Sequence, residues 1–389
     1  MLAPGLVDAH CHLEWSLLGG VLPAAPFPEW LGAMLGARGR MAPADHAGAA
    51  RLGALMALRA GTTTLADSGP TGAGIDALAE AGMRGIVHLE VFGAGGPDEA
   101  AARAEAAAEA IAALDGRAGP LLRVGASPHA PYSAGPALWA ALAAHPVLTA
   151  RPWATHLAES PHEEAAIAAG AGPLAATLAA HGLPCARWEA GDAEAPVARV
   201  AAGGALRPAL VAAHCVHLSP ADPDRLAAAA VAVAHCPTSN ARLRCGTAPL
   251  AALQRAGVRV GLGTDSPASA GPYDLRAEAR ACAAAHAGSP DPPGPAELVR
   301  LITLEAARAL GMDGIVGTLA PGLRADLVAV RPPPGADPGA EPHALLLDPA
   351  ARVAEVVVDG ETLLADGVPT RVDGAAIEAD AAERRVRLW

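Results

Sequence analysis

Two histidines, His10 and His12, stand one residue apart directly behind an apolar run that begins at Leu6. If this run is a β-strand, successive side chains alternate between its faces, so both imidazoles point the same way. Two imidazoles on one face can share a metal ion, although an isolated His-x-His fits a polar strand end with two solvated histidines equally well. The rest of the sequence must decide between these interpretations.

Further residues that can bind a metal or transfer a proton recur along the chain. Each stands at the end of an apolar run, and together they are Asp67, Glu90, His129, His156, Glu159, His214, His235 and Asp265. Any one of them alone would be an ordinary polar group at the edge of a core. Their repeated placement at the ends of successive runs predicts one shared site.

The runs have the spacing of strands separated by helices. We identify eight: GLVDAHCHLE, GTTTLADSG, GIVHLEVFG, LRVGASPHA, WATHLAES, ALVAAHCVHL, VAVAHCPTS and VRVGLGTDS. Stretches between them such as PDEAAARAEAAAEAIAALDG are good helix formers that end near glycine. Eight alternating units predict an α/β fold of the (β/α)8, TIM-like barrel type, whose active sites lie at the C-terminal strand ends. An open doubly wound sheet is the alternative, but no Gly-x-Gly-x-x-Gly turn follows any run.

Four of the strand-end residues form a plausible ligand set for one metal. His10, His12, His156 and Asp265 offer the nitrogen and carboxylate ligands of catalytic zinc sites, which keep one position open for water. The chain contains no lysine, which excludes a metal pair bridged by a carboxylated lysine and also Schiff-base chemistry. We therefore predict one divalent metal, Zn²⁺ in first place, with Fe²⁺ or Mn²⁺ as alternatives, and no other cofactor.

Proton transfer would fall to Glu159, His214 and Asp265. A bound metal lowers the pKa of water toward about 7, and the resulting hydroxide still needs a proton carrier. Glu159 follows His156 closely enough to face the same cavity and to carry a proton to the substrate and the leaving group. The alternative for Glu159 is a helix-start carboxylate favoured by the helix dipole. His214 either ligates the metal or holds the attacking water, and Asp265 could accept a proton as well as ligate.

Charge and composition limit the partners. The formal net charge of −12 disfavours nucleic acid or an anionic membrane surface and favours a small-molecule substrate. We find no signal peptide and no strongly apolar stretch of membrane-spanning length, and the six cysteines lack a Cys-x-x-Cys pair, so a cytoplasmic protein with reduced thiols is expected. The sequence leaves a homo-oligomer open.

The pattern changes near the C-terminus. After ELVRLITLEAARALGM, the segments GTLAPGLRADLVAVRPPPG and ARVAEVVVDGETLLADG show short alternating strands with Gly and Pro turns. We therefore predict a metal-dependent hydrolase barrel over residues 1–312 and a small β-sandwich-type segment with a C-terminal tail over residues 313–389.

The motifs PGLVDAHCH, THLAES, AAHCVHLS, AHCPTSN and GLGTDSPAS, in this order, resemble the amidohydrolase superfamily. They are most similar to its deaminase and chlorohydrolase branch, which includes guanine, adenosylhomocysteine and aminodeoxyfutalosine deaminases. The resemblance implies that His10, His12, His156 and Asp265 bind one metal. It also implies that Glu159 is the proton shuttle and that His214 lies beside the hydrolytic water. The implied reaction is attack of metal-bound hydroxide on a ring carbon, followed by loss of ammonia.

Substrate choice is predicted from finer similarities. SPHAPYS, HLAESPHEE and SNARLRCGT are similar to the aminodeoxyfutalosine deaminases of menaquinone biosynthesis, which makes that nucleoside the first expectation. The resemblance makes His129 a substrate contact. Tyr132 and Asn240 belong to residue types that are rare in this chain and are further pocket candidates, although packing or turn roles fit them equally. Arg242 or Arg244 could hold a substrate carboxylate.

Several alternatives stay open. The same site could deaminate adenosylhomocysteine, methylthioadenosine, guanine or cytosine, or hydrolyse a cyclic amide or a carbon–halogen bond. A non-catalytic barrel scaffold is the alternative of another class. Family members usually carry β-sandwich strands before the His-x-His strand, whereas here that strand begins almost at once. The sandwich is therefore reduced, covered by a partner chain, or completed by residues upstream of Met1, and unpaired strand edges are expected.

Overall fold

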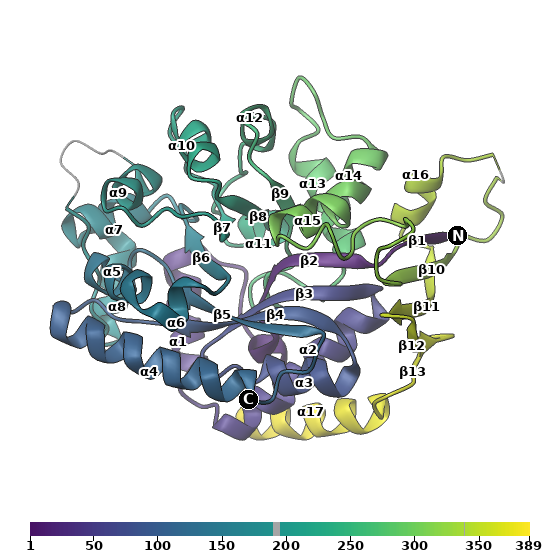
Figure 1. Ribbon diagram of the computed structural model, residues 1–389, viewed down its shortest axis with the longest axis horizontal. Coiled ribbons are helices and arrows are strands. Elements are labelled where there is room, and N and C mark those ends of the chain that lie inside the picture. The colour runs from purple at the N-terminus through teal and green to yellow at the C-terminus, as the bar shows by residue number, and fades with distance from the viewer. Residues whose placement is uncertain (190–194, 338) are drawn as a thin grey trace.

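The computed structural model describes residues 1–189, 195–337 and 339–389. Eight parallel strands form one sheet, in which each strand pairs with the next along the chain. They are β2 (Leu6–Cys11), β3 (Thr62–Gly69), β4 (Arg84–Val91), β5 (Leu122–Pro128), β6 (Trp153–Leu157), β7 (Leu210–His214), β8 (Ala232–His235) and β9 (Val260–Leu262). All eight predicted runs contain a strand, and the predicted α/β barrel is confirmed (Figure 1).

The barrel closes just beyond the last strand. The amide of Asp265 donates to the carbonyl of His10 at 3.0 Å, and the amide of His12 donates to the carbonyl of Asp265 at 3.0 Å. This extension of β9 therefore pairs with the end of β2. Closure of the barrel places His10 and His12, at the end of the first strand, beside Asp265, just after the last strand.

Helices surround the barrel strands. In chain order they are η1 (Leu13–Leu18), α1 (Phe27–Arg38), α2 (Pro43–Arg59), α3 (Gly74–Ala81), α4 (Pro97–Asp115), α5 (Pro136–Ala144), α6 (Pro146–Thr149), α7 (Glu163–Ala169), α8 (Gly172–Ala180), α9 (Pro196–Ala202), α10 (Asp222–Ala228), α11 (Pro237–Arg242), α12 (Leu250–Arg255), α13 (Leu275–Ala285), α14 (Pro295–Leu301) and α15 (Leu304–Ala309). The stretch predicted as the last barrel helix is two helices, α14 and α15, because Ile302 and Thr303 interrupt it.

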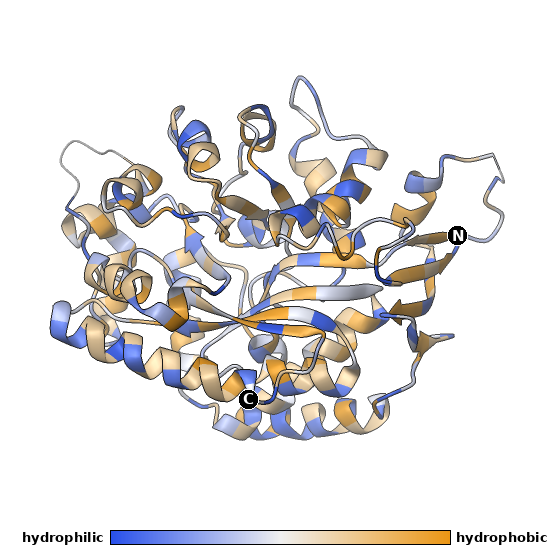
Figure 2. Ribbon diagram, in the orientation of Figure 1, coloured by the Kyte–Doolittle hydropathy of each residue, from blue (hydrophilic) through white to orange (hydrophobic). Residues whose placement is uncertain are grey.

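The core lies between the barrel strands and these helices. Strands β2, β3 and β4 are buried at every residue, as expected for parallel strands covered on both faces. In Figure 2 much of the barrel sheet is orange, whereas the C-terminal helix α17 (Gly374–Leu388) mixes blue and pale orange residues. Among the described residues, none of the helices combines the length and apolar character needed to cross a bilayer.

A separate antiparallel sheet lies at one end of the barrel (Figure 1). Its order is β1 (Leu2–Pro4), β10 (Leu327–Arg331), β11 (Arg352–Val358), β12 (Glu361–Ala365) and β13 (Val368–Pro369), with α16 (Pro342–Leu347) between β10 and β11. The first residues of the chain thus join this sheet rather than the barrel. Its edge strands β1 and β13 carry the exposed apolar side chains Leu2, at 67%, and Val368, at 65%.

A buried ion pair joins this sheet to the barrel. Arg84, at the start of β4, binds Asp326 through two nitrogen–oxygen contacts of 2.7 and 2.9 Å. Both side chains are nearly inaccessible, at 6% and 0% exposed. Asp326 also accepts the amide of Asp359 at 2.8 Å, so one carboxylate holds groups from both parts of the fold.

We expect Arg84→Met to lower the free energy of unfolding by about 3–5 kcal/mol, because it leaves the Asp326 carboxylate buried and unpaired. Urea denaturation measures this change. The matched control is Arg51→Met, which removes an ion pair with Glu80 whose side chains are 43% and 44% exposed, and it should cost less than about 1 kcal/mol. Equal losses in the two variants would contradict the assigned role of the buried pair.

Candidate functional site

A cavity of about 420 Å³ opens at the C-terminal ends of the barrel strands. Its floor is polar, with side chains at or just after the ends of β2, β4, β6, β7 and β9. These are His12, Glu90, His156, Glu159, His214 and Asp265. Its volume lies within the range of about 300–1,000 Å³ that is usual for small-molecule pockets. The strand-end residues predicted to share one site therefore largely do so.

The histidines of the floor cluster tightly. The Nε2 atoms of His12 and His156 are 3.1 Å apart, and the ring of His10 lies 4.7 Å and 4.9 Å from these two rings, centroid to centroid. Ligand atoms of His10, His12 and Asp265 lie within 4.8 Å of one another, and the same holds for His10, His156 and His214. All of these residues are buried.

Hydrogen bonds fix which nitrogen of each ring faces its neighbours. His12 Nδ1 lies 2.8 Å from the carbonyl of Ser68, and His156 Nδ1 lies 2.8 Å from the carbonyl of His129. A carbonyl can only accept, so each Nδ1 carries the proton and each Nε2 carries a lone pair. Burial lowers the pKa of His12 and lowers that of His156 to about 4, which keeps both rings neutral.

Two lone pairs that face each other at 3.1 Å repel unless a cation lies between them. The Nε2 atom of His10 is also buried without a hydrogen-bond partner among the described residues. Carbonyl groups that orient the rings from behind are the usual outer contacts of metal-binding histidines. The residues present therefore fit a divalent metal ion.

Asp265 is brought to this cluster because the segment after the last barrel strand, β9, packs closely against the first barrel strand, β2. A Cβ atom on Gly263 would lie 2.8 Å from the carbonyl oxygen of His10, so a residue without a side chain is needed there. Asp8, buried in β2, accepts the hydroxyl and the amide of Thr264 at 2.5 and 3.1 Å. Asp265 itself has a φ of +56°, a strained left-handed conformation of the kind found at functional sites. Its Oδ1 lies 3.6 Å from His12 Nε2.

Glu159 is held in the cavity by a second carboxylate. After β6 the backbone turns through Ala158, whose φ is +53°. The buried Glu163 accepts the amides of Ala158 and Glu159, each at 3.0 Å, and thereby fixes this turn. The carboxyl group of Glu159 lies 3.7 Å from His214 Nε2. Glu163 was not identified from the sequence, although it stands in the motif HLAESPHEE that contains Glu159.

Two of the three floor carboxyls, Glu159 and Asp265, have opposite pKa shifts, while burial raises the pKa of the third, Glu90, to about 8. Burial, with the nearby Asp265 and Glu163, raises the pKa of Glu159 well above its usual value, which favours the protonated form of this carboxyl. Burial alone would raise the pKa of Asp265 too, but its histidine neighbours, His12 first, bring it below its usual value. One carboxyl is therefore a proton donor and the other an anion, a division typical of acid–base sites.

His214 is oriented from behind by Asn240. The distance from His214 Nδ1 to Asn240 Oδ1 is 2.9 Å, and the amide oxygen can only accept, so His214 Nε2 faces the cavity without a proton. Both His214 and Cys215 have positive φ, +73° and +47°. Asn240 itself does not line the 420 Å³ cavity, so the structure places this predicted substrate contact behind the site.

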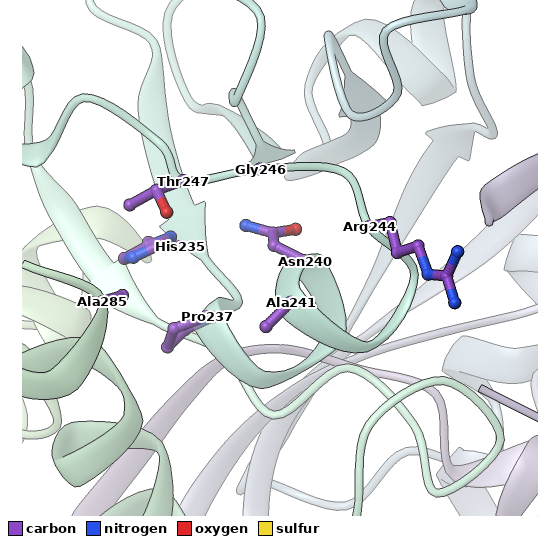
Figure 3. Close-up of a pocket in the computed structure, with 8 residues that line it drawn as sticks. All are labelled: His235, Pro237, Asn240, Ala241, Arg244, Gly246, Thr247 and Ala285. Atoms are coloured by element: carbon purple, nitrogen blue, oxygen red, sulfur yellow. The ribbon is translucent and has the colours of Figure 1, made fainter. Parts of the chain in front are cut away.

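Of the other residues predicted to contact the substrate, two line the cavity and two do not. His129 and Tyr132 line the cavity, with ring centroids 5.9 Å apart. Arg242 and Arg244 do not line it: the Arg242 guanidinium donates to the carbonyl of Leu22 at 2.8 Å, and Arg244 is exposed at the rim of a different cavity (Figure 3). The predicted carboxylate contact by either arginine is therefore not supported by their positions.

The apolar wall of the cavity was missed from the sequence. Most of it comes from η1, α1 and the residues after β4, and it includes Trp15, Phe27, Trp30, Leu31, Met34 and Phe92. Phenylalanine and tyrosine are scarce in this chain, so the concentration of aromatic residues between positions 15 and 30 was an available signal. Arg38, at the end of α1, lies 5.4 Å above the Phe92 ring and also lines the cavity.

Besides His10, which belongs to the histidine cluster, two strand-end residues lie outside the cavity lining. His235 faces a second cavity beside β8, and Asp67 lies under η1, where it accepts the amide of Leu13 at 2.8 Å. Burial raises the pKa of Asp67 to about 8, with Glu14 and Asp8 adding to the increase. Asp67 is thus a fold residue that anchors the loop after His12.

The buried Asp67 makes stability depend on pH. In the unfolded chain this carboxyl ionises near pH 4, so between about pH 4 and pH 8 the folded state binds the additional proton. The free energy of unfolding therefore falls as pH rises through this window. We expect Asp67→Asn to lose less stability than the wild type between about pH 5 and pH 8, measured by urea denaturation at both values. Asp76→Asn on α3 is the control and should keep the wild-type slope; an unchanged slope in Asp67→Asn would contradict the assignment.

Known proteins resemble this chain over nearly its whole length. A family model described as the amidohydrolase family matches residues 1–363. The chain is 32% identical to the 5-methylthioadenosine/S-adenosylhomocysteine deaminase of Symbiobacterium thermophilum, covering 100% of this chain and 86% of that protein. It is 31% identical to the 5′-deoxyadenosine deaminase of Methanothermobacter thermautotrophicus, covering 94% and 82%. The crystal structure of an adenosine deaminase from Xanthomonas campestris with bound zinc superposes with a TM-score of 0.82 at 29% identity, covering 100% of this chain and 85% of that one.

Proposed function

The chain belongs to the amidohydrolase family, and from this membership we propose that it is a metal-dependent hydrolytic deaminase of a 5′-substituted adenine nucleoside. The single observation that carries the proposal is the pair of oppositely shifted carboxyls, Glu159 and Asp265, which converge on a histidine cluster in one cavity. Deamination needs both a proton donor and a proton acceptor at the reacting carbon.

His10, His12, His156 and Asp265 would hold one divalent metal, which we propose to be Zn²⁺. When bound, such an ion lowers the pKa of water from about 15.7 toward about 7 and so supplies a nucleophile at neutral pH. Zinc is favoured because its ligands are typically imidazole nitrogens and carboxylate oxygens, and the adenosine deaminase relative contains bound zinc.

The protein groups then divide the proton transfers. Asp265, an anion, accepts a proton from the attacking water, while the protonated Glu159 donates to the ring nitrogen beside the attacked carbon. His214 Nε2 carries a lone pair and lies 3.7 Å from Glu159, so it accepts a hydrogen bond from the water and keeps it aligned. Return of a proton to the exocyclic nitrogen releases ammonia.

The wall of the cavity supports an adenine nucleoside with an apolar 5′ group. Trp15, Phe27, Met34 and Phe92 offer apolar and sulfur contacts to a thioether or methyl substituent. The names of the two deaminase relatives favour methylthioadenosine, adenosylhomocysteine or 5′-deoxyadenosine over aminodeoxyfutalosine, the first expectation from the motifs. A place in menaquinone biosynthesis is accordingly not part of the proposal.

The test is ammonia release by the zinc-loaded protein from a panel of nucleosides and bases. The panel contains 5′-methylthioadenosine, S-adenosylhomocysteine, 5′-deoxyadenosine, adenosine, aminodeoxyfutalosine, guanine and cytosine. Fastest release from one of the first three supports the proposal. Fastest release from aminodeoxyfutalosine would restore the motif-based expectation, and no release from any member with metal bound would overturn the deaminase assignment.

We expect Arg38 to distinguish S-adenosylhomocysteine from methylthioadenosine. It lines the cavity and forms no ion pair among the described residues, whereas Arg103, the other arginine of the lining, binds Glu99 at 2.6 Å. A free guanidinium suits the carboxylate of S-adenosylhomocysteine, which methylthioadenosine lacks. We expect Arg38→Met to lower kcat/KM for adenosylhomocysteine about 10- to 100-fold and to leave methylthioadenosine nearly unchanged. Equal losses for both substrates, in steady-state assays run side by side, would contradict this role.

A further inference from the structure

A second cluster of metal-binding residues lies outside the site described above. His235 ends β8, and Cys282 and His286 stand four residues apart on α13 and at its C-terminal cap. Residues at this spacing share one face of a helix. One ligand atom from each of the three residues lies within 4.8 Å of the other two. All three side chains are buried, with His235 at 1% and Cys282 at 0% exposed.

The distance between the two imidazoles is that of metal ligands rather than hydrogen-bond partners. The Nε2 atoms of His235 and His286 are 3.5 Å apart. A good nitrogen hydrogen bond is about 2.9–3.0 Å long, so this contact is weak. Two nitrogens bound to one tetrahedral zinc at about 2.05 Å lie about 3.4 Å apart. The Nε2 atoms of His235 and His286 already have nearly this separation.

His235 also lacks a partner for its other nitrogen. Its Nδ1 is buried with no hydrogen-bond partner among the described residues. The hydrogen bond to His286 at His235 Nε2 is weak, so a metal ion bound at this Nε2 atom would replace a poor contact with a strong one. Burial lowers the pKa of His235 to about 3, so the ring is neutral and its lone pair is available.

The second cavity gives this cluster access to solvent. It has a volume of about 270 Å³, and His235 and Ala285, the residue before His286, line it (Figure 3). Its rim includes the exposed residues Arg244, Gly246 and Thr247. An ion can therefore reach His235 without passing through the larger cavity at the strand ends.

We propose that His235, Cys282 and His286 form a second divalent-metal site, a His₂Cys site for Zn²⁺ that is separate from the catalytic cluster. Two nitrogens and one sulfur are typical zinc ligands, and a solvent molecule from the cavity completes the coordination. Zinc binding displaces the proton of the Cys282 thiol, whose pKa burial raises to about 12, and releases it to solvent. The proposal does not depend on the substrate of the enzyme.

The sulfur ligand distinguishes the two sites experimentally. The catalytic cluster offers only nitrogen and oxygen ligands, whereas Co²⁺ bound by a thiolate has a sulfur-to-metal charge-transfer band in the near ultraviolet. The full-length protein, stripped of metal, should bind two equivalents of Co²⁺ per chain and develop this band. Cys282→Ser and His286→Gln should each bind one equivalent and lose the band. Cys185→Ser, which removes a half-buried thiol outside the cluster, is the matched control and should retain it.

Three results would overturn the proposal: one equivalent of cobalt in the wild type, two equivalents without the band, or a band that survives Cys282→Ser. His286 is at the edge of the core, 9% exposed, so His286→Gln should remain folded and keeps the test decisive if Cys282→Ser unfolds. Zinc content by elemental analysis provides the second readout, with two ions in the wild type and one in either variant. A fourth result that would overturn the proposal is a band that appears only with a large excess of cobalt, because a built site binds the ion stoichiometrically.

Discussion

Replacing Glu159 by glutamine should lower kcat/KM about 10²- to 10⁴-fold and leave the metal content unchanged. Glutamine keeps the size and the hydrogen-bonding shape of the side chain but cannot give up and regain a proton. The buried Glu159 lies 3.7 Å from His214, and burial raises its pKa and so favours its protonated form. The proposed reaction depends on the exchange of this proton. Because the carboxyl is not among the predicted metal ligands, elemental analysis should find wild-type metal in the variant.

The matched control for this variant is Glu164→Gln. Glu164 lies on α7 close to Glu159 in sequence, but its side chain is 30% exposed and binds Arg199 at 2.6 Å. Its removal should leave kcat and KM at wild-type values. Wild-type turnover in Glu159→Gln would remove Glu159 from the mechanism. A loss of metal in that variant would instead make Glu159 a metal ligand.

Glu163 determines the position of Glu159. Its carboxylate accepts the amides of Ala158 and Glu159, and so it holds the strained turn that aims Glu159 at the cavity. Glu163 does not line the cavity and is therefore a positioning residue. The activity of Glu159 thus depends on a short segment, residues 158–163, whose conformation is set locally.

The barrel and the central cluster could be predicted from the sequence because one rule covers both. Parallel strands in a closed barrel end at the same rim, so residues as distant as His10 and Asp265 meet without any local signal between them. The alternation of side chains then places His10 and His12 on one face. These inferences need only the ends of strands, which the apolar runs mark clearly.

Features that depend on how loops fold back could not be predicted in this way. Asn240 lies in α11 directly after β8, but the helix turns its amide toward His214 and away from the cavity. The apolar wall comes from α1, which precedes α2 and β3 and has no strand of its own. The joining of β1 to β10 likewise depends on a pairing between opposite ends of the chain. Such placements depend on tertiary packing, which neither the hydrophobic periodicity of the sequence nor its motifs indicate.

Asp265 is expected to have the largest effect of any single side chain, because it serves the metal and the proton transfer together. Asp265→Ala should reduce metal affinity at least about 100-fold and abolish measurable deamination. The methyl group of alanine cannot bind the metal in place of the Asp265 carboxylate beside His12. The divalent cation would then be held by neutral imidazoles without the negative charge of Asp265. Elemental analysis after dialysis and ammonia release measure the two effects, and circular dichroism verifies the fold.

A second variant separates the two roles of Asp265. Asp265→Asn keeps an oxygen at the same place but removes the negative charge that the histidine neighbours stabilise. If Asp265 acts only as a ligand, excess Zn²⁺ should restore turnover in Asp265→Asn. We expect the opposite, full metal occupancy with turnover still at least about 10²-fold below the wild type, because the amide cannot accept the proton of the attacking water. Full activity in Asp265→Ala would refute both roles, since neither the metal nor the proton transfer would then need this carboxylate.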